Sequence, residues 1–223
     1  MVDVKDMIRE LERDLGRVEK DIRNHPYLAT LEAGRIRRED LRLLAGEQYH
    51  VMTSDLRSVE LMASRFDAAP SRALFRSLLA GKQTALASLF VFARAIGLDE
   101  PLLEAHEPAP GTQAYPAFVT WLAVHASDAE IAVAYLMNAA VWGESCGRIA
   151  GALRSQYGMS AAHTAFFDSF ATPSAEHDTQ VLTVVAAGLT AGVDRRRMAR
   201  AARLLQGYEK LFWDTLLALS RAG

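Results

Sequence analysis

Residues 43–52 read Leu-Leu-Ala-Gly-Glu-Gln-Tyr-His-Val-Met, in the middle of a segment with the apolar spacing of a long helix. Glu47 and His50 are three residues apart and therefore share one helical face. Leu44 and Val51 stand three residues before and four residues after Glu47, so we expect that face to point inward. Burying a charged group is costly unless it is paired or protonated. The stretch therefore predicts either a site with shifted pKa values or a structural Glu–His hydrogen bond.

The overall composition indicates which class of protein and which partners to expect. Of the 223 residues, 50% are hydrophobic and 23% are charged, which is typical of a globular chain with a sizeable core. The formal net charge of −2 provides no strong positive field, so nucleic acid and an anionic membrane surface are not expected as main partners. We expect a small-molecule substrate and other protein subunits instead.

Cys146 is the single cysteine, which excludes an intramolecular disulfide and a cysteine-rich zinc site. This usage fits a reducing compartment. Residues 1–6, Met-Val-Asp-Val-Lys-Asp, are too charged for a secretory signal. No uninterrupted apolar run approaches the roughly 18 residues that a membrane helix needs. The sequence therefore predicts a cytoplasmic protein with no membrane-spanning segment.

Apolar residues recur at helical spacing along almost the whole chain. The predicted helices cover residues 3–23, a segment from 35 to about 66, one from 70 to about 97, then 115–126, 127 to about 155, 163–170, one that starts at Pro173, and the C-terminal segment from Asp194. Residues 98–114, with three prolines and Gly111, form the clearest loop. No phosphate-binding glycine loop, internal repeat or domain boundary is found. The sequence therefore predicts one all-α domain, residues 1–223, with seven to eight helices.

The segment 181–193 is ambiguous. Its β-branched residues Val181, Thr183, Val184 and Val185 would permit a strand. Because no partner strand is found elsewhere, we assign it to a helix.

Several polar side chains fall on apolar helix faces. The segment from Ser127 to about 155 is apolar almost all round, so its Asn138, Trp142 and Glu144 need an explanation. Near the C-terminus, Glu209 has apolar residues one turn before and one turn after it. We therefore expect Glu209 to be at least partly buried.

Three local patterns together resemble the TenA/thiaminase II and PqqC group, whose members have the haem-oxygenase-like all-helical fold. They are Asn24-His25-Pro26-Tyr27-Leu28 after the first helix, Glu47-Gln48-Tyr49-His50 after the segment from Gly34 to Leu41, and Tyr208-Glu209-Lys210-Leu211-Phe212-Trp213-Asp214 near the end. The similarity spans nearly the entire chain in helix order. It implies a haem-oxygenase-like helical bundle that assembles as a homodimer or homotetramer.

The resemblance also implies site residues. In the thiaminase II branch an Asp on the second helix binds the aminopyrimidine, with a Tyr one turn on, and the matching positions here are Glu47 and His50. The branch's tyrosine ahead of the central helix matches Tyr115. Its C-terminal catalytic Glu matches Glu209.

The nucleophilic cysteine of that branch is missing here, because Asn138 occupies its place. Cys146 is no simple substitute, since eight residues rotate a helix by about 80° beyond whole turns and move it by roughly 12 Å along the axis. A hydrolase of this kind would work without a thiolate. The resemblance then points to Glu47 and Glu209 as base and acid on a bound water.

Oxidative chemistry is the enzymatic alternative. In the haem-oxygenase-like di-iron oxidases, Glu144 and His177 would match two ligands, but Phe170 and Ser174 occupy two other ligand places, and residues 81–92 hold no Glu or His. A single metal ion such as iron, held by Glu47, His50, Glu144 and His177, is the remaining metal-dependent alternative.

A PqqC-like oxidation and haem binding are two further alternatives. His177, which follows Glu176, resembles the pair of the PqqC branch, in which dioxygen oxidises a bound organic substrate without metal. Haem is not expected, since the first helix has no His for a proximal ligand. We therefore expect no cofactor for the hydrolase.

The predicted pocket combines aromatic and polar side chains from separate parts of the chain: Glu47, His50, Tyr115, Asn138, Trp142, Phe170, His177 and Glu209. Aromatic walls with carboxylates suit a flat nitrogen heterocycle. The sequence therefore predicts a TenA-like hydrolase, or a related enzyme, that acts on an aminopyrimidine-like small molecule. A non-catalytic small-molecule binding or regulatory protein is the alternative from another class.

Overall fold

The computed structural model describes residues 4–172 and 174–222, which form helices and no strand. The helices are α1 Val4–Arg23, α2 Pro26–Glu32, α3 Leu41–Arg65, α4 Ser71–Ala95, α5 Glu100–Glu104, α6 Pro110–His125, α7 Asp128–Tyr157, α8 Ala161–Ala171, α9 Ala175–Thr190 and α10 Arg195–Ala222. Among these, α2 and α5 span only seven and five residues. The eight longer helices confirm the predicted all-α class.

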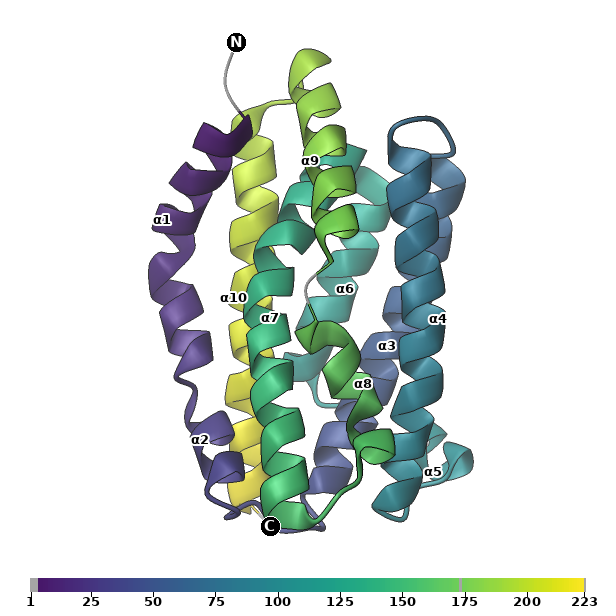
Figure 1. The fold of residues 1–223 in the computed structure, drawn as a ribbon, viewed down its shortest axis with the longest axis vertical. Helices are drawn as coiled ribbons and strands as arrows, with labels where there is room; N and C mark the ends of the chain where they lie inside the picture. The colour runs from purple at the N-terminus through teal and green to yellow at the C-terminus, as the bar shows by residue number, and fades with distance from the viewer. Residues whose placement is uncertain (1–3, 173, 223) are drawn as a thin grey trace.

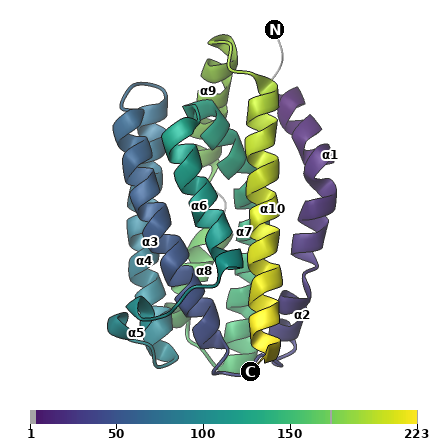
Figure 2. The same ribbon diagram turned by 180° about the vertical axis from the view of Figure 1, so that it is seen from behind.

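The long helices run side by side along the long axis of the molecule (Figure 1). α7 and α10 pack against each other in the middle, with α1 on one side and α3 and α4 on the other (Figures 1 and 2). α6 lies between α3 and α10, and α8 and α9 cover the opposite face of α7 (Figures 1 and 2). This arrangement makes α7 the central element, as its apolar sequence predicts. No helix in the described part of the chain is both long and apolar enough to cross a membrane.

α7 begins and ends at residues with clear local signals. The side chain of Ser127 accepts a hydrogen bond from the Glu130 backbone N–H, and the Glu130 carboxylate accepts one from the Ser127 N–H at 2.9 Å. This capping box satisfies two N–H groups that the first turn leaves without helical partners. At the other end, Gly158 adopts a φ of +66°, a left-handed conformation that glycine tolerates best. The predicted start at Ser127 is therefore confirmed.

The predicted loop 98–114 is wrong in two places. α5 lies within it, and α6 begins at Pro110, five residues before the predicted start at Tyr115. Proline fits the first turn of a helix because the missing N–H would have no helical partner there. The predicted helix over 181–193 is confirmed as far as Thr190 in α9. The predicted helix start at Pro173 lies outside the described residues.

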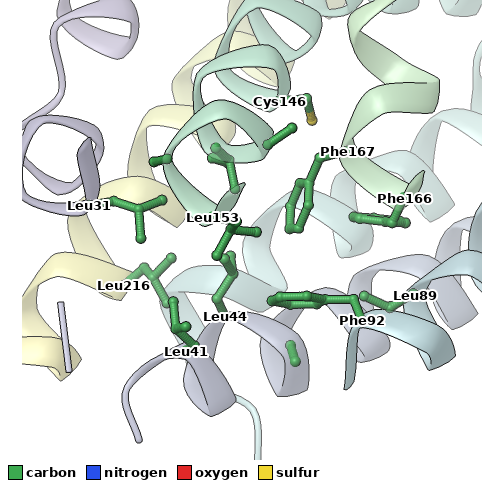
Figure 3. Packing of buried hydrophobic residues seen from close by; sticks show 14 of the residues in the cluster. Leu31, Leu41, Leu44, Leu89, Phe92, Cys146, Leu153, Phe166, Phe167 and Leu216 are labelled. Atoms are coloured by element: carbon green, nitrogen blue, oxygen red, sulfur yellow. The ribbon is translucent and has the colours of Figure 1, made fainter. Parts of the chain in front are cut away.

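The largest hydrophobic core fills the end of the bundle at which α2 and α5 lie (Figure 1). In it Phe92 of α4 meets Phe167 of α8 edge to face, with ring centroids 5.2 Å apart. Figure 3 shows Leu44 and Leu153 packed beside these rings, with Cys146 at the edge of the same cluster.

Candidate functional site

A cavity of about 1150 Å³ lies between α3 and α4 on one side and α7, α8 and α9 on the other. Six of the eight predicted pocket residues line it: Tyr115, Asn138, Trp142, Phe170, His177 and Glu209. They come from five helices, so only the folded chain brings them together. The mixture of apolar walls with a few polar groups is typical of a small-molecule site.

Glu209 is a buried carboxylate in the wall of this cavity, 3% exposed. Its Oε1 accepts a hydrogen bond from Trp213 Nε1 at 3.3 Å, and its Oε2 accepts one from the Asn138 amide. Burial raises the pKa of Glu209 from 4.5 to about 7, although these two hydrogen bonds act in the opposite direction. Both protonation states are therefore accessible at neutral pH, which suits a group that accepts and returns a proton.

Asn138 occupies a fixed position between Glu209 and Tyr115. The Tyr115 hydroxyl donates to Asn138 Oδ1 at 3.0 Å, while Asn138 Nδ2 donates to Glu209 and to Gln206 Oε1, the latter at 3.4 Å. Burial raises the pKa of the Tyr115 hydroxyl well above its ordinary value, which keeps it protonated and able to donate. These bonds fix which end of the carboxamide faces Glu209.

Asp55 and Lys82 form a second polar group in the cavity wall, which was not predicted from the sequence. Lys82 Nζ donates to Asp55 Oδ2 at 2.7 Å, and Asp55 is 1% exposed. Helical spacing could have indicated Asp55, because it follows Gln48 by seven residues and Met52 by three. All three residues line the cavity. The ammonium group of Lys82 also lies 5.7 Å from the ring centroid of Phe170.

The expectation that Glu47 shares a chamber with Glu209 is corrected by the structure. Glu47 is 1% exposed but faces the segment between α5 and α6. Its Oε1 accepts the Ala109 backbone N–H at 3.1 Å and lies 3.1 Å from His106 Nε2, and its Oε2 accepts from the Thr112 hydroxyl. Burial alone would raise the pKa of Glu47, but these hydrogen bonds lower it below its ordinary value.

His50 lies beside Glu47 and also outside the cavity lining. Its Nε2–H donates to the His106 carbonyl oxygen at 2.7 Å, and the two imidazole rings stack with centroids 6.0 Å apart. A helix turns by about 100° per residue, so the face with Gln48 and Asp55 meets the cavity and the adjacent face does not. A buried Glu–His contact does exist, but it joins Glu47 to His106 rather than to His50.

The alternative metal ligands do not come together. Glu47 and His50 contact the α5–α6 segment. Glu144 lines the cavity, but its half-exposed side chain accepts from Arg23 Nε at 2.8 Å. His177 lines the cavity, and burial lowers its pKa. Within residues 4–172 and 174–222, no group of three or more His, Cys, Asp or Glu side chains is placed to hold a metal ion. The predicted four-ligand set is therefore not assembled.

Cys146 lies in the hydrophobic core rather than on the cavity wall (Figure 3). It is fully buried, and this burial raises the pKa of its thiol well above the ordinary value. A thiol in this state is a poor nucleophile. The expectation that Cys146 does not replace the missing cysteine agrees with this position.

The fold is shared with proteins of known structure. A model of the TENA/THI-4/PQQC family matches residues 12–218. A TenA homologue protein from P. horikoshii OT3 superimposes with a TM-score of 0.76 at 19% sequence identity and covers 100% of both chains. A TenA homologue from Pseudomonas syringae pv. tomato gives a TM-score of 0.81 at 12% identity, covering 94% of this chain and 92% of that chain.

The third structure carries a description of its fold. A domain of unknown function with a haem-oxygenase-like fold, from Shewanella denitrificans, gives a TM-score of 0.80 at 12% identity and covers 99% of this chain and 94% of that chain. The predicted haem-oxygenase-like fold is thus confirmed. A search of curated proteins finds no match.

Proposed function

This chain belongs to the TENA/THI-4/PQQC family, and from that premise we propose that it is a hydrolase that cleaves a C–N bond of a small, flat, amino-substituted nitrogen heterocycle. The observation that supports this reaction most directly is Glu209, buried in the cavity wall with its pKa raised to about 7. Family membership supports the broad class, and the side chains of the cavity support the choice of substrate.

Aromatic walls favour a flat ring as the substrate. Trp142 and Phe170 meet edge to face with centroids 5.8 Å apart, and both line the cavity together with Tyr115 and Phe212. Aromatic side chains bind planar rings by offset or edge contacts. The polar groups Asn138 and Glu209 are then available for the nitrogen atoms of such a ring.

The proposed reaction needs one water molecule and one residue that exchanges a proton. As the carboxylate, Glu209 takes a proton from water while the water oxygen bonds to the ring carbon that carries the leaving nitrogen. As the carboxylic acid, it returns that proton to the nitrogen as the C–N bond breaks. Ammonia or an amine leaves, and the oxygen stays on the ring. A pKa near the working pH suits both roles.

The position of Asn138 favours a second candidate, a non-catalytic protein that binds the same kind of ring. A carboxamide cannot act as the nucleophile of the thiaminase II branch, and the thiol of Cys146 lies in the core. Both candidates bind the same kind of ring, but only the hydrolase converts it to product.

The test is release of ammonia or amine from a panel of mono- and diaminopyrimidines. We expect release by the wild type and a loss of about 100-fold or more in Glu209→Gln, whereas binding of the same compounds persists. Glu60→Gln, at an exposed position of α3, is the matched control and should behave as the wild type. Binding without release by the wild type would reject the hydrolase and favour the binding protein.

A further inference from the structure

We propose that Asp55, Lys82 and Tyr135 form a second polar subsite of the cavity, which binds an uncharged amidine-like edge of the ligand, an N–H group next to a ring nitrogen. The inference rests on the proposed function in so far as it assumes that the cavity holds a nitrogen heterocycle. It adds the residues that recognise the end of the ring remote from the bond that is cut.

Asp55 supplies the first reason. One carboxylate oxygen, Oδ2, is paired with Lys82 Nζ at 2.7 Å, while Oδ1 is buried and has no hydrogen-bond partner among the described residues. Buried polar atoms are nearly always paired, because an unpaired one loses its hydration without compensation. Asp55 lines the cavity, so a ligand N–H group is the partner that fits this oxygen.

Tyr135 supplies the second reason. It is 8% exposed, it lines the same cavity from α7, and its hydroxyl is also buried without a partner in the described part of the chain. Tyr135 and Asn138 are three residues apart on α7 and therefore share the helix face that meets the cavity. A free phenol O–H can donate to an acceptor on the ligand. Two unpaired atoms of complementary kinds thus occur in one cavity wall.

The charges of the subsite determine which ligand fits. Lys82 balances the charge of Asp55 at 2.7 Å, so the pair presents no net formal charge. A ligand anion would meet Asp55 and a ligand cation would meet Lys82, and in a poorly hydrated wall such like-charge contacts are costly. A neutral group with one donor and one acceptor side by side satisfies Asp55 Oδ1 and the Tyr135 hydroxyl together.

An aminopyrimidine carries this pattern in its exocyclic N–H and the neighbouring ring nitrogen. Because Glu209 lines the same cavity, a substrate held in this way needs a second C–N bond for cleavage there. The substrate class is then a heterocycle with two functional ends, an amidine edge that is recognised and a C–N bond that is cut.

The test is calorimetric binding of 4-aminopyrimidine and 4-(dimethylamino)pyrimidine, which differ in the N–H donors. We expect the wild type to bind the first about tenfold more tightly, the effect of one hydrogen bond at a buried site. In Asp55→Leu/Lys82→Met, which removes the two charges together, this preference should fall to about threefold or less. It should persist in Glu209→Gln, which keeps the subsite intact.

Tyr135→Phe provides a second test of the subsite, because it removes a hydroxyl and leaves the charges of Asp55 and Lys82 unchanged. We expect it to weaken 4-aminopyrimidine binding about fivefold. Tyr27→Phe is the matched control, because Tyr27 also has a buried hydroxyl without a partner among the described residues but is absent from the cavity lining. That control should bind as the wild type.

Three outcomes would overturn the subsite: a preference that survives in Asp55→Leu/Lys82→Met, a preference lost in Glu209→Gln instead, or no binding of either compound by the wild type. If the double variant does not fold, unchanged affinity in Tyr135→Phe overturns it. None of these readings requires turnover, so failure of the hydrolase proposal is seen separately in the amine-release assay.

Discussion

The amide of Asn138 donates a hydrogen bond to the carboxylate of Glu209, and so joins the middle of α7 to α10 inside the cavity wall. The same amide accepts from Tyr115 on α6, so three helices meet at one chain of polar side chains. Glu209 keeps a raised pKa in spite of these bonds, because burial disfavours its charged form more strongly. We therefore expect the stability of the fold to depend on pH.

Glu209 should lower the stability of the fold as the pH rises. Its pKa is 4.5 in the ordinary state and about 7 in the folded protein, so between these values the folded chain holds a proton that the unfolded chain has lost. Stability then falls with rising pH across this window and levels off above it. Between about pH 4 and about pH 8, we expect the free energy of unfolding of the wild type to fall by about 3 kcal/mol relative to that of Glu209→Gln. Urea denaturation at a series of pH values measures this, and a constant difference between the two proteins would contradict it.

Glu47 should behave in the opposite way. Its hydrogen bonds to the α5–α6 segment lower its pKa, so it stabilises the fold above the unfolded pKa and loses this effect as the pH falls through the folded pKa. We expect Glu47→Gln to cost about 2 kcal/mol at neutral pH and less in acid. Amine release per folded molecule should persist, because Glu47 lies outside the cavity lining. Denaturation of the variant at neutral and acidic pH, with Glu60→Gln as control, tests the first part. Loss of release with the fold intact would contradict the second.

The helices could be predicted because their signals are local. The capping residues Ser127 and Glu130 are three apart, and the apolar spacing that defines α3 and α7 lies within each segment. Pro110 is compatible with a helix start, but the contact that holds the start of α6 is not local, because the Ala109 N–H is satisfied by Glu47, 62 residues away. Tertiary contacts of this kind leave no local pattern in the sequence.

The site was predictable only in part for a related reason. Asn138 and Glu209 stand out as polar residues among apolar neighbours, and the structure places both at the cavity. Glu47 stands out equally, yet its face of α3 meets the α5–α6 segment instead. Burial can be inferred from spacing, but which of two buried faces meets the cavity depends on how α3 packs against α4 and α6. Asp55 lies on the face of α3 that meets the cavity, and the sequence alone does not separate this face from the one that carries Glu47.

Gly143 should be required for the approach of α8 to α7. A Cβ atom there would lie 2.7 Å from the Phe170 carbonyl oxygen, a backbone atom, so the two helices would have to separate next to the cavity. We expect Gly143→Ala to destabilise the fold by about 1–3 kcal/mol. Gly151→Ala is the matched control on the same helix, because a Cβ there meets nothing within 4 Å. It should stabilise the fold by about 0.5–1 kcal/mol through helix propensity. Thermal denaturation of both variants measures the contrast, and equal shifts in the same direction would contradict the close contact.

Cys146 should take no part in the chemistry. Its thiol is fully buried beside the aromatic core, and burial raises its pKa, so little thiolate forms at neutral pH (Figure 3). We expect Cys146→Ala to keep the wild-type rate of amine release while costing about 1–2 kcal/mol of stability from the lost packing. In the native protein, an alkylating reagent such as iodoacetamide should label the thiol far more slowly than in urea and should leave release unchanged. Rapid labelling of the folded chain accompanied by loss of activity would mean that the thiol reaches the cavity, and the carboxylate mechanism would then have to be replaced by a thiol one.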